Sequence, residues 1–342
     1  MVALSATGCF GGGNRPIGWS GVTVSGNEIY FGTTTGKLIS LNRDSGSVRW
    51  QTDLADAQGI YGSPLVVDDT VYVTSFGGRV FAVTTGGALK WSAPPPDVKL
   101  PDAVVGGMAY ANGRLYYGST NGTVYALDAA TGALVWDFTT GDKIWATPVI
   151  ENGVVYVGSF DNKFYALSAD NGAEVWNFEA GGVFIAAAVF SGDNVIVGSL
   201  DRNLYAFDKV TGAKEWQFTG QKWFWASPLL AGDRVYAPNT DGKVYVLESV
   251  DGTKVGEFAS VAPVASAPTA ADGLVVFADE NGALSVIDTA SQQVSPLIDL
   301  KTTVRASLSA ADAIVFVHSQ TNETVYALNA VTKAQLWQYT VQ

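Results

Sequence analysis

One cysteine and one histidine occur among the 342 residues of this chain. The single cysteine, Cys9, excludes an internal disulfide and a cluster of thiolates around a metal ion. The single histidine, His318, excludes a metal site with several imidazoles, and no nucleophile-elbow pattern surrounds the nearby Ser307 or Ser319. We therefore expect His318 to be a surface or strand-end residue, and we predict no catalytic or metal-binding residues.

Charged residues are also scarce, and basic ones most of all. They make up 15% of the chain, with 32 Asp and Glu against 20 Lys and Arg and a net charge of −12. A field of this sign repels phosphate backbones and anionic lipid surfaces. No basic run occurs, and no apolar stretch reaches the roughly 20 residues of a membrane-spanning helix. We therefore expect no nucleic-acid partner and no direct membrane contact except through a lipid anchor.

Glycines and aromatic residues are abundant instead, and they recur at a fixed interval. The chain has 38 Gly, 10 Trp, 14 Tyr and 16 Phe, a composition typical of short strands and tight turns. One strand position repeats every 40 to 44 residues, at Tyr30, Tyr72, Tyr116, Tyr156, Ile196, Tyr236, Val276 and Phe316. A period of this length with four strands per unit is the signature of a propeller.

Each unit reads as four strands separated by turns. In the fourth unit, residues 154–157 and 164–167 alternate apolar and outward-facing positions, and Asn152-Gly153 supplies the positive φ that a tight hairpin requires. A four-stranded blade cannot bury both faces alone, so it must stack on copies of itself. The sequence therefore predicts an all-β fold, an eight-bladed propeller of four-stranded antiparallel blades.

The outer strand of most units carries a tryptophan at one position, where a large ring can pack between blades. These residues are Trp50, Trp91, Trp136, Trp176, Trp216 and Trp337, and we expect them to be structural. Gly256 and Pro296 replace the ring in two consecutive units, which predicts looser seams there. Asp128, Asp208 and Asp288 recur at a strand end, where such side chains cap turns more often than they bind Ca²⁺.

The N-terminal segment has the features of a processing site. Cys9 follows small residues and precedes Phe10 and a Gly-rich stretch, which resembles the end of a bacterial lipoprotein signal peptide with a lipidated cysteine. Ala6 departs from that pattern, and the segment from Met1 is short for a full signal peptide. The alternative is a free cysteine in a tail. We expect a tail over residues 1–15 and the propeller over 16–342, outside the cytoplasm if lipidated and cytoplasmic if Met1 is the true start.

The recurring string resembles a known family. It reads GSTNGTVYALDAATGALVWDF at residues 118–138 and GSLDRNLYAFDKVTGAKEWQF at residues 198–218. It is similar to the repeat of the PQQ-like (quinoprotein alcohol dehydrogenase-like) propeller superfamily over almost the whole chain. That superfamily includes PQQ-dependent alcohol dehydrogenases, BamB-like envelope lipoproteins and sensor domains of bacterial kinases. The resemblance is specific for the fold and much less so for the function.

Two functions follow from this resemblance. Quinoprotein dehydrogenases of the superfamily typically place adjacent cysteines beside the quinone and hold Ca²⁺ with carboxylate and amide oxygens, whereas Cys9 is alone and outside the repeats. The BamB-like members, similar in length and blade number, imply a monomeric, non-catalytic scaffolding propeller that binds a protein partner in the cell envelope without a cofactor. The alternative is an enzyme, or a protein that binds PQQ with calcium, another small molecule or a carbohydrate.

The position eleven residues before the repeated strand position varies in residue type between units more informatively than the others. We expect it to begin the innermost strand, on the face that also carries the loops between second and third strands. Aromatic and basic residues there would suit a flat ligand, a sugar or a peptide. The predicted rim residues are Trp19, Tyr61, Phe76, Trp145, Phe160, Lys222, Trp223, Trp225 and Arg305. The alternative is that these side chains only fill a wide axial channel.

Overall fold

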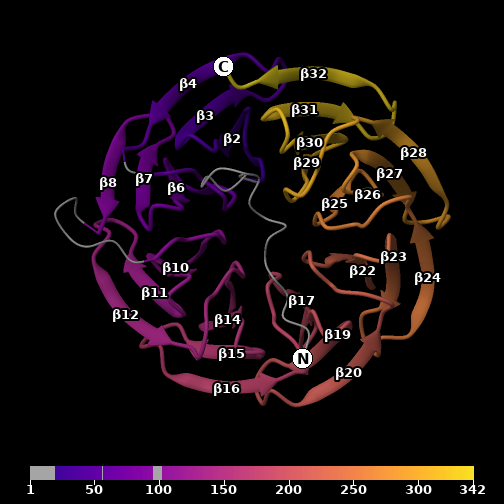
Figure 1. Ribbon diagram of the computed structural model, residues 1–342, viewed down its shortest axis with the longest axis horizontal. Helices are drawn as coiled ribbons and strands as arrows, with labels where there is room; N and C mark the ends of the chain where they lie inside the picture. Colours follow the sequence, from indigo (N-terminus) through magenta and orange to yellow (C-terminus); the bar gives the residue numbers. More distant parts are fainter. Residues whose placement is uncertain (1–19, 56, 95–101) are drawn as a thin grey trace.

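The computed structural model describes residues 20–55, 57–94 and 102–342, and these form eight sheets of four antiparallel strands each. Figure 1 shows the sheets as blades around a central axis, with the first strand of each blade innermost and the fourth outermost. This arrangement confirms the eight-bladed propeller. Within the described ranges, no helix is long and apolar enough to cross a membrane.

The strands of the first four blades follow one another along the chain. Blade 1 contains β1 (Thr23–Ser25), β2 (Glu28–Gly32), β3 (Lys37–Asn42) and β4 (Val48–Asp53). Blade 2 contains β5 (Leu65–Val67), β6 (Thr70–Thr74), β7 (Val80–Thr84) and β8 (Leu89–Ala93). Blade 3 contains β9 (Ala109–Ala111), β10 (Arg114–Gly118), β11 (Thr123–Asp128) and β12 (Leu134–Thr139). Blade 4 contains β13 (Val149–Glu151), β14 (Val154–Gly158), β15 (Lys163–Ser168) and β16 (Glu174–Glu179).

The last four blades repeat this order. Blade 5 contains β17 (Val189–Ser191), β18 (Asn194–Gly198), β19 (Asn203–Asp208) and β20 (Lys214–Thr219). Blade 6 contains β21 (Leu229–Ala231), β22 (Arg234–Asn239), β23 (Lys243–Glu248) and β24 (Lys254–Ala259). Blade 7 contains β25 (Thr269–Ala271), β26 (Leu274–Ala278), β27 (Ala283–Asp288) and β28 (Val294–Asp299). Blade 8 contains β29 (Ser309–Ala311), β30 (Ile314–His318), β31 (Thr324–Asn329) and β32 (Gln335–Thr340).

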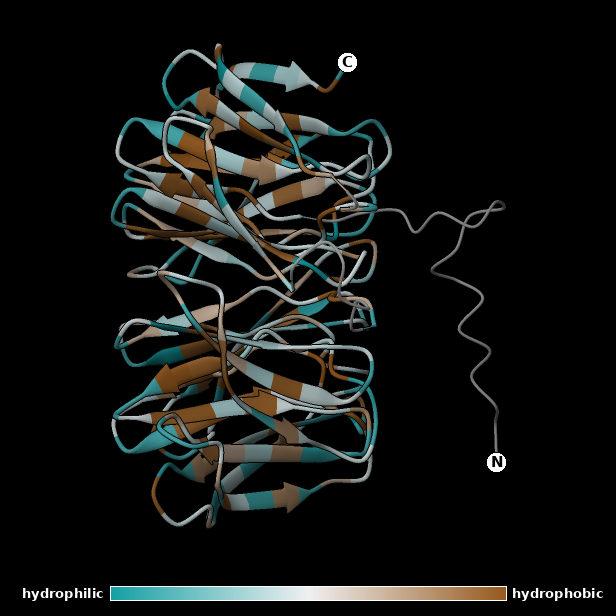
Figure 2. Cartoon of the chain, turned by 90° about the vertical axis from the view of Figure 1, so that its left-hand side faces the viewer, coloured by the Kyte–Doolittle hydropathy of each residue, from teal (hydrophilic) through white to brown (hydrophobic). Residues whose placement is uncertain are grey.

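The hydrophobic core lies between blades rather than inside any one of them. The middle strands β14 and β15 are buried on both faces, because a neighbouring blade covers each side. Figure 2 shows the hydrophobic residues along the strands and the hydrophilic ones in the turns at the two faces. Those turns have the predicted geometry, with φ of 50° at Asn152 and 76° at Gly153. The blades therefore stabilise one another by stacking.

At six seams a tryptophan ties one blade to the next. The Nε1–H of Trp136 donates a 2.9 Å hydrogen bond to the Ala169 carbonyl of the following blade. The ring also covers Gly172, where a Cβ would lie only 2.6 Å from a ring atom. Equivalent bonds are donated by Trp50, Trp91, Trp176, Trp216 and Trp337. The structure thus confirms that these rings dock neighbouring blades.

The two seams without a tryptophan also lack the glycine that the indole ring covers at the other seams. Gln292 replaces the glycine between blades 6 and 7, and its amide donates to the Thr289 carbonyl at 2.8 Å and to the Tyr236 hydroxyl at 3.1 Å. Thr289 holds the place of the carbonyl that an indole N–H reaches elsewhere. Lys333 replaces the glycine between blades 7 and 8 and donates to Ser295 Oγ at 2.9 Å. Polar side chains therefore substitute for the missing rings.

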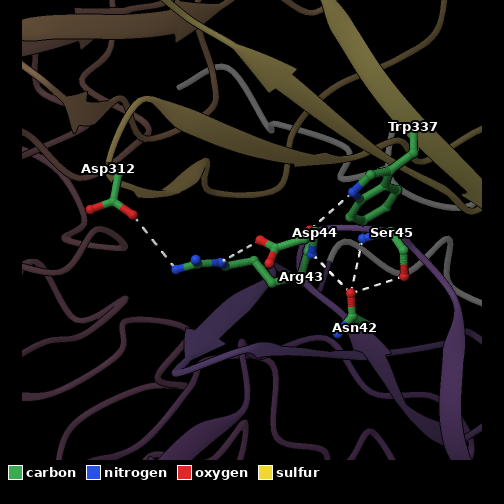
Figure 3. Close-up of polar contacts among 6 residues, drawn as sticks. All are labelled: Asn42, Arg43, Asp44, Ser45, Asp312 and Trp337. Atoms are coloured by element: carbon green, nitrogen blue, oxygen red, sulfur yellow. Dashed lines mark hydrogen bonds and ion pairs between the residues drawn. The ribbon is translucent and has the colours of Figure 1, made fainter.

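The ring closes by stacking of blade 8 on blade 1, because every blade takes its four strands from one continuous stretch of chain. Figure 3 shows this seam, where Trp337 of β32 reaches the Arg43 carbonyl and the Arg43 side chain lies 3.6 Å from Asp312. Asn42 fixes the turn by accepting hydrogen bonds from the backbone of Asp44 and Ser45 at 3.1 and 2.9 Å. The closing seam thus uses the same tryptophan–carbonyl contact as five interior seams.

His318 lies at the end of β30, as expected, but it is buried at this seam rather than at the surface. Its Nδ1–H donates to the Ser20 carbonyl at 2.8 Å, and its ring meets Phe31 edge-on with centroids 5.0 Å apart. Burial lowers the pKa of the imidazole, against smaller raising effects of the Ser20 bond and Glu323. His318 is therefore a neutral structural residue.

Candidate functional site

The predicted rim position lines the central channel. Tyr61, Trp145, Trp225 and Arg305 all border one cavity of about 140 Å³, together with the smaller Val105, Ile185 and Ala265 at the same position. These residues precede the innermost strands instead of beginning them, because β13 starts only at Val149. The same offset occurs in blades 2 to 8, whether the residue before the strand is Pro148, Met108 or Ala188. The expected strand start is therefore wrong by four residues.

A repeated backbone hydrogen bond holds the channel segments against the loops between second and third strands. The N–H of Phe160 donates to the Lys143 carbonyl at 3.0 Å, and the N–H of Phe76 donates to the Gly59 carbonyl at 2.8 Å. The equivalent bond in blade 6 joins Thr240 to the Trp223 carbonyl at 3.0 Å. The channel position and the loops therefore share one face, as predicted. We call this face the channel mouth.

Blade 4 brings two predicted rings and one unpredicted cation together. The ring of Trp145 meets that of Phe160 edge-on, with centroids 4.7 Å apart and planes at 67°. The Lys143 ammonium lies 4.5 Å from the Phe160 centroid and 5.7 Å from that of Trp145. The Trp145 Nε1–H is buried without a hydrogen-bond partner among the described residues. Lys143 could have been found from the sequence, because it occupies the position of Trp223 in blade 6.

Blade 2 carries a similar pair that is more deeply packed. The rings of Tyr61 and Phe76 lie 5.2 Å apart, but Tyr61 is only 3% exposed. Its burial, with a smaller effect of Glu323, raises the pKa of the phenol well above its ordinary value. Tyr61 therefore forms part of the channel wall, whereas Phe76 is half-buried beside it.

Blade 6 presents its residues to solvent. Trp223 is 38% exposed and Lys222 is exposed beside it, while Trp225 is half-buried against the cavity. Asn239 fixes this segment, because its side-chain amide donates to the Lys222 carbonyl at 2.9 Å and its oxygen accepts from the Lys222 N–H at 3.2 Å. A rigid backbone therefore holds Trp223 outward.

Blades 7 and 8 replace the aromatic pair with an ion pair. The Nε of Arg305 lies 3.0 Å from Oε1 of Glu280, and both side chains are about a third exposed, at 32% and 27%. Glu280 occupies the loop position of Phe76 and Phe160. Its contact with Arg305 could not be found from the composition of the chain. Because the guanidinium is compensated by this carboxylate, Arg305 adds little net charge to the channel mouth.

Below the mouth, the channel lining alternates between successive blades. Hydroxyl residues lie at one position in even blades: Ser63, Thr147, Ser227 and Ser307. Odd blades have Gly or Ala there, and their backbone N–H groups donate to the neighbouring hydroxyl, at 2.8 Å from Gly107 to Thr147 and 3.0 Å from Ala187 to Ser227. A Cβ on Gly21 would lie 2.3 Å from Ser63 Oγ. Thr147 and Ser227 therefore accept hydrogen bonds from the backbone of the preceding blade.

Two predicted residues, Trp19 and Cys9, lie outside the described residues. So does most of the long connection at residues 93–101.

The resemblance to the superfamily's dehydrogenases directs attention to metal ligands among the described residues. No group of three or more His, Cys, Asp or Glu side chains within those ranges could hold a metal ion. The recurring aspartates cap turns instead. Oδ1 of Asp128 accepts hydrogen bonds from the Thr131 backbone at 2.9 Å and hydroxyl at 2.7 Å, which lower the pKa of that carboxyl.

The fold and channel define an eight-bladed propeller of PQQ-like repeats. A family profile described as outer membrane protein assembly factor BamB matches residues 13–101, 78–187, 179–255 and 251–342. The chain belongs to this family.

Individual relatives resemble parts of the chain. The outer membrane protein assembly factor BamB of Taylorella asinigenitalis (strain MCE3) is 32% identical over 134 residues, 36% of this chain and 34% of that protein. The dehydrogenase subunit of the quinone alcohol dehydrogenase of Komagataeibacter europaeus is 36% identical over 130 residues, 34% of this chain and 18% of that protein. Each alignment thus spans about a third or less of the relative.

A solved structure shares the fold over most of its length. BamB from Moraxella catarrhalis matches with a TM-score of 0.74 and 18% identity, over 87% of this chain and 93% of that one. At this identity the likeness shows the fold alone.

Proposed function

We propose that this protein is a non-catalytic extracytoplasmic scaffold that binds a protein partner in the cell envelope through its channel mouth. The observation that carries the proposal is Trp223, which is 38% exposed and is the one aromatic residue classed as exposed in the described ranges. Trp side chains are enriched at protein-binding surfaces, where they act as apolar anchors inside a polar rim. Lipid anchoring through Cys9 and a monomeric state belong to the same proposal.

Family membership supports this function. The matched family, one relative in sequence and one solved structure with the same fold all carry the name of an outer membrane assembly factor. Such a role needs a rigid surface and no reaction centre. The fixed backbone under Trp223, held by Asn239 and Thr240, supplies that rigidity at 2.9 to 3.2 Å hydrogen bonds.

Site-specific photocrosslinking tests the proposal. A photoreactive phenylalanine at position 223 should crosslink one discrete envelope protein in cells of the producing organism. The matched control is position 250, because Val250 is 77% exposed and lies in the turn after β23, away from the mouth. Identical adducts from both positions, or none from 223, would contradict a partner at the mouth. Trp223→Ala should also abolish co-purification of the crosslinked protein.

A second function is favoured by the relatives named as quinone alcohol dehydrogenases, which are up to 38% identical over short stretches. PQQ or another small ring could enter the same channel. Incubation of the purified protein with PQQ and Ca²⁺, followed by a dye-linked alcohol oxidation assay, separates the two functions. Turnover would overturn the non-catalytic scaffold.

A further inference from the structure

A groove lies between blades 6 and 7, on the face opposite the channel mouth. It has a volume of about 520 Å³ and is lined by turns and strand ends of the two blades. Two backbone hydrogen bonds fix these turns, from Ser249 to the Asp233 carbonyl at 2.9 Å and from Thr289 to the Gly273 carbonyl at 3.1 Å. The groove therefore has a rigid frame and is separate from the channel.

A small residue on the first strand of blade 7 leaves this groove open. Ala270 is exposed there and borders the groove. The same position in the four preceding blades carries larger side chains: Tyr110, Ile150, Phe190 and Leu230. Each of these is partly buried against the core of its seam. The seam between blades 6 and 7 is therefore incompletely filled on this face.

The seam between blades 4 and 5 shows what fills the same space elsewhere. There Lys209 of blade 5 bonds Glu151 of blade 4, and its ammonium lies 5.6 Å from the centroid of the Phe190 ring. Ala270 and Thr289 occupy the positions of Phe190 and Lys209 at the groove. The filled seam thus contains one aromatic and one basic side chain that the groove lacks.

The lining of the groove has an excess of negative charge. It includes the carboxylates of Asp233 and Glu248 but a single guanidinium, that of Arg234. Arg234 lies 3.7 Å from Glu248, and both side chains are 34% exposed, which makes a weak ion pair. Asp233 is exposed and forms no ion pair in the part of the chain that the structure describes. One carboxylate is therefore left for a cation from outside the chain.

The charged groups around the groove strengthen this preference. The neighbouring turns and strand ends add three carboxylates, Asp251, Asp272 and Asp288, and one ammonium, that of Lys254, which is paired with Glu257 at 3.0 Å. Asp251 and Asp288 accept backbone N–H groups at 2.9 and 2.7 Å. Because these donors are neutral, the two carboxylates keep their charge. A basic ligand that approaches this face therefore meets a favourable field.

The rest of the lining suits the stem of a long side chain. Ala231, Ala270 and Leu274 give the groove apolar walls. Lys and Arg lay their methylene groups along such a surface while the charged head stays at its edge. The volume of about 520 Å³ also exceeds the roughly 150 Å³ that holds one benzene ring, so two side chains fit.

We infer that this groove binds a segment of a partner polypeptide that presents an aromatic and a basic side chain on the same side. The basic group reaches Asp233 and Glu248, and the aromatic ring fills the space beside Ala270. The partner thus supplies the pair of side chains that Phe190 and Lys209 supply within the chain. Because the groove lies opposite the channel mouth, this site is independent of the proposed function.

Fluorescence anisotropy with matched peptides tests this inference. The probes are heptapeptides Gly-Ser-Phe-Ser-X-Ser-Gly with a neutral N-terminal dye, an amidated C-terminus, and Arg, Gln or Glu as X. In an extended peptide the Phe and X side chains point to the same side. The Arg peptide should bind about tenfold more tightly than the Gln peptide, because a charge-assisted hydrogen bond is lost. Equal binding of the three peptides, or no binding of the Arg peptide, would overturn the inference.

A pair of charge variants separates the groove from the general acidity of the chain. Asp233→Asn should remove most of the difference between the Arg and Gln peptides. Asp193→Asn is the matched control, because Asp193 is exposed at the same turn position of blade 5 and its loss changes the net charge equally. If both variants lose the difference to the same extent, the peptide is attracted by net charge and the groove is not its site.

A second pair of variants tests the shape of the site. Ala270→Phe introduces the residue of blade 5 and should abolish binding of the Arg peptide, and Ala270→Leu, with the residue of blade 6, should weaken it severalfold. Ala270→Ser keeps the small size and should bind as the parent does. Circular dichroism of each variant establishes that its fold is retained. Unchanged binding by both the Phe and the Leu variant would refute a site in this groove.

Discussion

The indole Nε1 of Trp337 donates a 2.9 Å hydrogen bond to the backbone carbonyl of Arg43, across 294 positions of the sequence. The same bond at an interior seam, from Trp176 to Lys209, spans only 33 positions. The two bonds are chemically equal, but the closing one must bring the ends of the propeller together. Loop-closure entropy makes that contact costlier to form. The closing seam therefore depends on Trp337 to hold the first and last blades in contact.

Replacement of Trp337 by Phe should lower the free energy of unfolding by about 1–2 kcal/mol, since the Arg43 carbonyl loses its donor while most of the ring remains. Equilibrium urea denaturation measures the change. Trp176→Phe, which removes the same bond from an interior seam, is the comparison. A Trp337 variant as stable as the parent would show that the closing bond contributes nothing.

The repeat made the fold predictable, because each blade carries its own copy of the pattern. Trp136 and its counterparts dock as expected, since a ring at one position of six outer strands has no other place to pack. The strand start near Trp145 was misplaced because the spacing gives the period of the repeat but not the residue at which ladder pairing begins. Glu280 was missed because its pairing with Arg305 depends on a contact between separate segments, whereas Lys143 shares the repeat position of Trp223 and could have been found.

The seam between blades 6 and 7 lacks both the tryptophan and the glycine that pack together elsewhere. We therefore expect changes at these two positions to have coupled effects on stability. Gly256 has room for a side chain, because a Cβ there would lie 3.8 Å from Val246. Gln292, however, occupies the place where an indole would lie over a glycine. We expect Gly256→Trp alone to destabilise the protein, and Gly256→Trp with Gln292→Gly to be more stable than the sum of the single changes by about 1 kcal/mol or more.

Urea denaturation of the four proteins in this cycle gives the coupling energy. Hydrogen exchange adds a local readout, because the parent seam should exchange faster around Gly256 and Pro296 than around Trp176, and the double variant should slow exchange at Gly256. Additive single effects would refute the idea that the two positions form one docking unit.

The alternating channel lining predicts a specific role for the Thr147 hydroxyl. Thr147→Val keeps the shape and removes the acceptor of the Gly107 N–H, so the free energy of unfolding should fall by about 1–3 kcal/mol. Thr147→Ser keeps the hydroxyl and should lose much less. Thermal unfolding followed by circular dichroism compares the two, and equal losses would mean that the methyl group, not the bond, matters.

His318 predicts a dependence of stability on pH. Its pKa in the folded protein is lowered below the ordinary value of 6.5 by burial, so the unfolded chain binds a proton first as the pH falls. Stability from this group is complete above about pH 6.5 and is lost as the pH falls below it, by up to about 1.4 kcal/mol per pH unit. The turn-capping Asp128 and Asp208 also have lowered pKa values, but their contribution is lost only below the ordinary value of 3.8. Urea denaturation between pH 5 and 7 should therefore show a slope that His318→Gln removes, and a slope unchanged in that variant would assign the effect to another group.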